Sequence, residues 1–133
     1  MKIVGSSEST SRKGPADWFT GTVWLDEIPT NAEPSRLHSL SVTFEPGART
    51  AWHTHPLGQV LHVVSGSGLV QSKGQPVRKI HPGDTVIIAP NEVHWHGAGP
   101  QNIMVHLALL ESNSEGVHVT WMEKVSDAEY AAV

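Results

Sequence analysis

Short apolar runs separated by glycine and proline turns constrain the fold of this chain more than any other feature of its sequence. Residues 37–44 alternate apolar and polar side chains, with Leu40, Val42 and Phe44 on one face, which is typical of a half-buried strand. Turn-forming residues recur at positions 45–47, 56–58, 73–76, 81–84 and 90–91. We therefore expect roughly eight to ten short strands, arranged as an all-β barrel or a double-sheet jelly roll.

One segment favours a helix. In residues 126–132, Ser126 is suited to be the N-cap and Glu129 completes a capping box. Residues 117–122 are expected to form the strand before it. The 133 residues suit a single domain spanning 1–133, in which the small and polar residues of positions 1–15 form an N-terminal arm.

The composition excludes several classes of function. A formal net charge of -4, with no cluster of basic residues, gives no footprint for nucleic acid. No run of residues is long and apolar enough for a signal peptide or a membrane span, so we expect a cytoplasmic protein with no membrane partner. The sequence contains no cysteine, so any bound metal must accept nitrogen and oxygen ligands.

Paired histidines indicate a metal site. His53 and His55 are two residues apart, and residues i and i+2 of a strand point to the same side of a sheet. Gln59 follows a turn and faces back toward them, and His94, in the second pair with His96, is the expected fourth ligand. These four ligands are neutral and leave two positions open on a six-coordinate ion, which favours Mn²⁺ or Fe²⁺ over Zn²⁺ or Ni²⁺.

Two further histidines are candidates for acid–base chemistry. His96 shares the face of His94, and His106 lies in an apolar run, so each is either a general base or a buried, hydrogen-bonded core residue. A dry pocket wall is expected from Leu40, Val42, Ala108 and Leu110. His38 and His118 are interpreted as structural or surface residues.

Aromatic residues suggest assembly. Trp18, Phe19 and Trp24 lie in or beside the polar lead-in, which a single barrel would cover poorly, so we expect a homo-oligomer, a dimer or a tetramer. Trp52 and Trp95 have the opposite parity to the ligands and are expected to pack against the second sheet or against a partner.

The spacing Gly47-x5-His53-x-His55-x3-Gln59-x6-Gly66 resembles the first cupin motif, with Gln59 where that family usually has Glu, and Gly83-x10-His94 resembles the second. Further runs resemble the small bacterial single-domain cupins that include the manganese-dependent hydroxynitrile lyases; they are residues 13–21, 41–59, 94–98, 104–106 and 121–123. The resemblance implies a cupin jelly-roll barrel with a short C-terminal helix.

The same resemblance implies an activity. It is the reversible cleavage of cyanohydrins to an aldehyde and cyanide, with the metal as Lewis acid, His96 or His106 as base, and Thr50 assisting. Three alternatives remain open on this scaffold: a metal-dependent oxygenase, an isomerase, or a non-catalytic protein that binds a small ligand.

Overall fold

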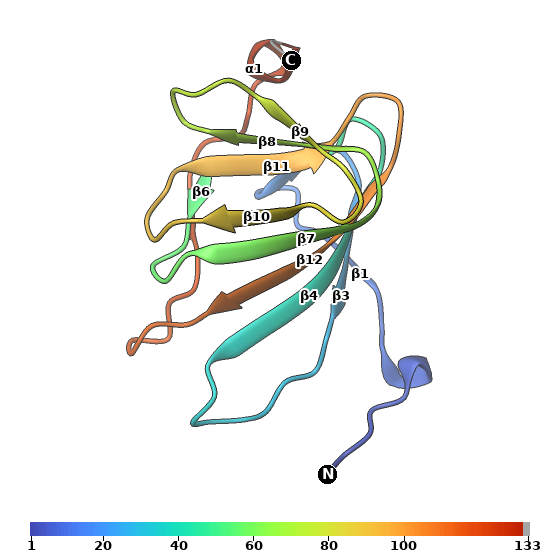
Figure 1. Ribbon diagram of the computed structural model, residues 1–133, viewed down its shortest axis with the longest axis vertical. Helices are drawn as coiled ribbons and strands as arrows, with labels where there is room; N and C mark the ends of the chain where they lie inside the picture. The colour runs from blue at the N-terminus through green and yellow to red at the C-terminus, as the bar shows by residue number, and fades with distance from the viewer. Residues whose placement is uncertain (132–133) are drawn as a thin grey trace.

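Residues 1–131, which a computed structural model describes, form two antiparallel sheets and a short C-terminal helix (Figure 1). The first sheet has six strands in the spatial order β1 (Arg12–Lys13), β3 (Val23–Glu27), β4 (Leu37–Phe44), β12 (Met104–Glu111), β7 (Gln59–Gly66) and β10 (Thr85–Ile88). The second has seven, in the order β13 (Thr120–Trp121), β6 (His53–Thr54), β11 (His94–Ala98), β5 (Arg49–Thr50) and β2 (Phe19–Thr20), with β8 (Gly68–Ser72) paired to β11 and β9 (Arg78–Ile80) paired to β8. The all-β prediction is confirmed.

The remaining elements lie at the two ends of the chain. A single 3-10 turn, η1 (Ser6–Glu8), precedes β1, and the helix α1 (Asp127–Ala131) follows β13. The Ser126 backbone N–H donates to Glu129, and the Glu129 N–H donates to the Ser126 hydroxyl, so the predicted capping box is present. Ala132, in the segment expected to be helical, lies outside the described residues.

The strand boundaries follow the hydrophobic pattern where it alternates. β4 spans the residues predicted for it, and it pairs with β12 over its whole length, from Phe44 opposite Met104 to Leu37 opposite Glu111. The prediction of a strand over residues 117–122 was too long, because only Thr120 and Trp121 pair with β6.

The interior between the sheets is apolar at one end and polar at the other. Phe44, Leu61 and Met104 are the largest fully buried apolar side chains of the main core. In the central strand β12, Met104, His106, Ala108 and Leu110 face this interior, and the alternate residues face outward. The interior face of the six-stranded sheet thus carries both core residues and the candidate base His106.

A bulge lies beside His106. β12 pairs with β7 at Val105 opposite Ser65 and then at His106 opposite Val63, so Val64 is left without a partner in the ladder. Gly66 at the end of β7 has a φ of +83°. A Cβ at this position would lie 1.9 Å from the carbonyl oxygen of Ile103, so glycine is required both by conformation and by space. Bulges of this kind commonly reorient a side chain beside a functional site.

The outer face of the seven-stranded sheet is covered by the C-terminal segment. Trp52 and Trp95 pack there with Leu69 and Val125, and the ring of Tyr130 lies 5.9 Å from that of Trp95. The expectation that these tryptophans face the second sheet or a partner is therefore wrong, because the chain's own C-terminal segment buries them.

Arg49 anchors this covering segment. Its guanidinium is buried, donates to the Val125 carbonyl at 2.9 Å and to Asp127 at 2.8 Å, and lies 4.5 Å from the centre of the Tyr130 ring. The Tyr130 hydroxyl donates to the carbonyl of Ala98 at 2.7 Å. These contacts tie the short helix to β5 and β11, and hence to the back of the strands that carry the histidines.

The aromatic residues of the lead-in are only partly exposed. Phe19 is buried in the main core, whereas Trp18 is 41% exposed and Trp24 is 39% exposed, although Trp18 stacks on Trp121 with ring centroids 5.2 Å apart. The premise that a single barrel leaves Phe19 uncovered is thus incorrect. No helix among residues 1–131 is long and apolar enough to cross a membrane.

Candidate metal centre

The paired histidines converge at the polar end of the interior. His53 comes from β6 and His94 and His96 from β11, which is antiparallel to β6 with His94 directly opposite His53. One ring nitrogen from each of these three side chains lies within 4.8 Å of the others. His55 follows β6, and its ring centroid lies 5.0 Å from that of His53 and 5.4 Å from that of His94. The strand pairing thus brings the two His-x-His pairs together.

Backbone carbonyls orient three of these rings. The Nδ1 atoms of His53, His55 and His94 lie 2.8, 2.8 and 2.9 Å from the carbonyl oxygens of Ala51, His118 and Glu92. A carbonyl oxygen only accepts hydrogen bonds, so each Nδ1 carries the proton and each neutral ring presents the lone pair of Nε2. This outer hydrogen bond is the arrangement that fixes the tautomer of metal-binding histidines.

Several buried acceptors in this cluster lack a donor. The Nε2 atoms of His55 and His94 and the Oε1 atom of Gln59 are buried without a hydrogen-bond partner among residues 1–131. Gln59 is the first residue of β7, so its oxygen comes from the opposite sheet. Buried polar atoms are normally paired. Unpaired nitrogen and amide oxygen acceptors, all neutral, fit a divalent cation.

Burial keeps these imidazoles neutral. Desolvation lowers the pKa of His53 well below its usual range, with a further contribution from the nearby His94. Desolvation also lowers the pKa of His55, and it lowers that of His94 to about 4. Near pH 7 the three rings are therefore in the form that binds metal.

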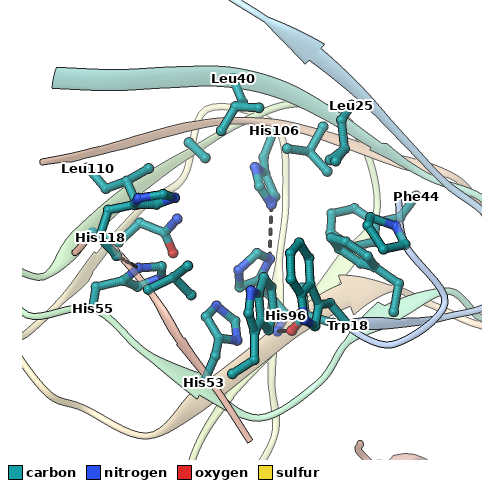
Figure 2. A pocket seen from close by; sticks show the side chains of 18 of the residues that line it. Trp18, Leu25, Leu40, Phe44, His53, His55, His96, His106, Leu110 and His118 are labelled. Atoms are coloured by element: carbon teal, nitrogen blue, oxygen red, sulfur yellow. Dashed lines mark hydrogen bonds between the residues drawn. The ribbon is translucent and has the colours of Figure 1, made fainter. Parts of the chain in front are cut away.

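His96 and His106 form a hydrogen-bonded pair from opposite sheets (Figure 2). Nδ1 of His96 and Nε2 of His106 are 3.0 Å apart, and both side chains are almost completely buried. Burial is the main cause that lowers the pKa of both rings, to about 4 in His106, and His106 lowers that of His96 further. Nε2 of His96 and Nδ1 of His106 have no hydrogen-bond partner in the described chain. Each ring in this pair can donate or accept, so a proton can be shared between the two rings. The Nδ1 protons of His53, His55 and His94 cannot be shared in this way, because a carbonyl oxygen only accepts.

Thr50 is linked to this pair. It is buried in β5, and its hydroxyl oxygen accepts a hydrogen bond from the backbone N–H of His96 at 3.2 Å. The Thr50 side chain also lines the cavity described next. It therefore both fixes the backbone of β11 and lies within reach of a small ligand.

A cavity of about 380 Å³ opens beside the histidines (Figure 2). The four residues predicted for its wall, Leu40, Val42, Ala108 and Leu110, all line it, as do His53, His55, Gln59, His96 and His106. Its volume lies within the range of small-molecule sites, and its wall is mostly apolar, with the histidines and Gln59 as polar groups. His94 packs against His53, with ring centroids 4.2 Å apart.

Part of this wall was not predicted from the sequence. Trp18, Leu25, Phe44 and Trp121 also line the cavity, and so does His118, which we had interpreted as a structural or surface residue. The parity of β4 indicated Phe44, which shares the inner face with Leu40 and Val42. The other four come from short strands and loops, where the sequence has no periodicity to indicate direction.

Comparison with known proteins identifies the family. The family model described as a cupin domain matches residues 40–107, a segment that contains the four expected ligands and both candidate bases. The chain belongs to the cupin family.

Individual relatives are more specific. The chain is 55% identical over 130 residues to a protein of Granulicella tundricola named (R)-mandelonitrile lyase, covering 98% of this chain and 97% of that protein. A crystal structure of a cupin-like protein from Thermotoga maritima matches with a TM-score of 0.83 and 42% identity over 89% of both chains. The polyketide cyclase RemF of Streptomyces resistomycificus, at 18% identity and a TM-score of 0.75 over 98% of this chain and 90% of its own, shares the fold.

Proposed function

We propose that this protein is a metal-dependent cupin lyase that cleaves cyanohydrins reversibly to an aldehyde and hydrogen cyanide. The observation that carries the proposal is the near full-length identity of 55% to an (R)-mandelonitrile lyase. The site supports it, because a donor set for a cation, a pair of neutral histidines and an apolar cavity adjoin one another. The substrate class we propose is that of small aryl cyanohydrins such as mandelonitrile.

His53, His55, Gln59 and His94 would hold the metal. Their acceptor atoms are neutral, so the ion keeps its full charge, and Mn²⁺ is the proposed occupant, with Fe²⁺ as the alternative and Zn²⁺ or Ni²⁺ less suited. When bound, such an ion supplies Lewis acidity that stabilises negative charge on a substrate oxygen. The competing assignment replaces His55 by His96, because a ring nitrogen of His96 also lies close to those of His53 and His94.

The histidine pair is the proposed base. In the cleavage direction, a ring nitrogen of His96 or His106 takes the hydroxyl proton of the cyanohydrin. The carbonyl forms as the carbon–cyanide bond breaks, and the bonding electron pair leaves with the cyanide. The histidine pair then returns the proton to the cyanide, which gives hydrogen cyanide. No oxidant or reductant is needed. Thr50 assists by holding the backbone of His96.

The apolar wall positions the aryl group. Leu40, Val42 and Ala108 come from the neighbouring strands β4 and β12, where Leu40 lies opposite Ala108 and Val42 opposite His106. This register places the apolar wall beside the candidate base. A substrate held against it presents its hydroxyl to the polar end of the cavity, which favours one enantiomer in the reverse reaction.

We also propose a homo-oligomer, a dimer or a tetramer, and a cytoplasmic location. The first is supported by apolar side chains on the outer face of the six-stranded sheet. The second rests on the composition alone and stays a prediction.

The activity is tested with mandelonitrile. The Mn²⁺-loaded protein should release benzaldehyde and cyanide faster than free Mn²⁺ in the same buffer, and chelation should abolish the difference. The reverse addition should give an enantiomeric excess. Equal rates with and without protein would refute the lyase assignment, and dioxygen uptake or turnover of a keto-sugar would then favour the oxygenase or the isomerase.

A further inference from the structure

The segment that joins β12 to β13 supplies one of the groups that orient the candidate ligands. Residues 112–119 form no strand or helix, yet the His118 carbonyl accepts the hydrogen bond from Nδ1 of His55 at 2.8 Å. His53 and His94 are oriented by the carbonyls of Ala51 and Glu92, which precede them by two residues in the chain. His55 is different, because the direction of its ring depends on where this distant loop lies.

His38 contacts this loop at both of its ends. It is on β4, opposite Leu110, and its Nε2 atom lies 2.6 Å from the hydroxyl oxygen of Ser112, the first residue of the loop. Its ring stacks on that of His118 near the other end, with centroids 4.4 Å apart and an angle of 26° between the planes. A single side chain from the sheet therefore joins the beginning of the loop to the residue whose carbonyl holds His55.

The hydrogen bonds at the tip of the loop join residues of the loop to one another. The side-chain oxygen of Asn113 accepts hydrogen bonds from the backbone N–H groups of Glu115 and Val117, and the Asn113 backbone N–H donates to the Val117 carbonyl at 2.8 Å. These bonds close the turn but do not attach it to the barrel. At the base, the Ser112 N–H donates to the Arg36 carbonyl at 3.0 Å.

We propose that His38 and His118 are positioning residues, whose stacked rings hold the 112–119 loop so that the His118 carbonyl fixes the ring of His55. His118 acts through its carbonyl and His38 acts through His118. His118 also lines the cavity, so the same stack holds part of the cavity wall. The consequence for metal binding rests on the proposed ligand set, in which His55 is a ligand. Removing an outer partner of a ligating histidine typically weakens metal binding by 10–100-fold.

The first test uses the metal-free protein and does not depend on its activity. With ¹⁵N-labelled histidine, the Nδ1–H of His55 should give a slowly exchanging NMR signal, identified by its absence in H55Q. His38→Ala and His118→Ala should speed its exchange with water at least tenfold. His118→Phe, which keeps a ring for stacking and the carbonyl, should retain the slow signal. His62→Ala is the matched control, because His62 bonds Thr85 on an exposed part of the same sheet.

The second test measures Mn²⁺ affinity by the electron paramagnetic resonance signal of the free ion. His38→Ala should raise the dissociation constant about tenfold or more, whereas Ser112→Ala, which keeps the ring stack, should have a smaller effect. Unchanged ring N–H exchange in His38→Ala and His118→Ala, with melting temperatures near that of the wild type, would overturn the positioning role. Failure to cleave mandelonitrile, with these shifts present, would instead count against the lyase alone.

Discussion

At the scale of single residues, the direction of each imidazole is set by what its Nδ1 atom meets. Carbonyl oxygens face His53, His55 and His94, whereas another imidazole faces His96. This difference separates the proposed ligands from the proposed base without reference to burial, which all four share. It also yields two predictions that distinguish the roles.

The first prediction concerns the ligands. His53→Ala and His55→Ala should each weaken Mn²⁺ binding on the order of 10²-fold or more, since each removes a donor. Elemental analysis of protein purified with and without added Mn²⁺ measures this, with His62→Ala as the control on an exposed histidine. Full metal content in the His53→Ala, His55→Ala double variant would exclude this centre.

The second prediction concerns the base. His96→Ala and His106→Ala should lower kcat for mandelonitrile cleavage on the order of 10²-fold or more, the size expected for loss of a general base. Their metal content should match the wild type. Loss of metal from His96→Ala, with metal retained in His55→Ala, would instead place His96 among the ligands, as the close approach of the His53, His94 and His96 nitrogens allows.

The sequence predicted these residues better than it predicted their surroundings. His-x-His spacing on strands was enough to bring His53 and His94 together, because pleat parity and strand pairing are local properties. His118 was missed because its contribution to His55 is a main-chain oxygen, which any residue type would supply. A contact made by a backbone carbonyl of a loop therefore cannot be predicted from the type of the residue.

At the scale of elements, glycine at the end of β7 is required for the register beside His106. Gly66→Ala should cost about 2–5 kcal/mol of unfolding free energy, because it combines a left-handed φ with a collision against the Ile103 carbonyl. Gly74→Ala is the matched control: its φ is +81° but a Cβ there meets no atom within 4 Å, so it should cost only about 1–2 kcal/mol. If chemical denaturation gives equal losses of unfolding free energy for the two variants, the chain relieves the collision at residue 66.

The helix α1 gives a prediction with a pH dependence. The hydrogen bond from the Ser126 backbone lowers the pKa of Glu129 below its ordinary value of 4.5. A carboxyl group with a lowered pKa stabilises the folded state above its ordinary pKa, and this contribution is lost as the pH falls through the lowered value. Glu129→Ala should therefore lose a few tenths of a kcal/mol at pH 7, since the side chain is 37% exposed and solvent screens it, and less at pH 3. Thermal unfolding at both pH values measures this, and a gap that widens in acid would contradict it.

Element boundaries were predictable where burial alternates. β4 was predicted to the residue because apolar and polar side chains alternate over residues 40–44. Around residues 117–122 the apolar residues belong to a turn and an irregular segment, so only Thr120 and Trp121 pair. Parity placed Trp52 and Trp95 opposite the histidines correctly, but it carries no information on which segment covers them.

At the scale of the whole molecule, the two sheets differ in what covers their outer faces. The C-terminal segment covers the seven-stranded sheet, whereas Ile87, Val60 and Leu109 form a cross-strand row on the outside of the six-stranded one. Ile87 is 80% exposed and Leu109 is 36% exposed. Light scattering at micromolar concentration should therefore give the mass of a dimer or a tetramer.

A charge within this row should disrupt the assembly. Leu109→Glu should shift the mass toward a monomer, because a carboxylate buried in an interface without a partner is costly. Asn31→Glu, in an exposed loop, should leave the mass unchanged. A monomeric wild type would rule the oligomer out.

The proposed ligands come from both sheets. His53 and His94 belong to one and Gln59 to the other, so an ion held by all three is a reversible cross-link across the barrel. A ligand that binds only the folded chain adds RT ln(1 + [L]/Kd) to its stability, which is about 2.7 kcal/mol when free metal is a hundred times Kd. With the proposed ligand set, the closure of the barrel would be coupled to the concentration of free metal, and a chain made in metal-poor conditions is expected to have a looser site as well as a less active one.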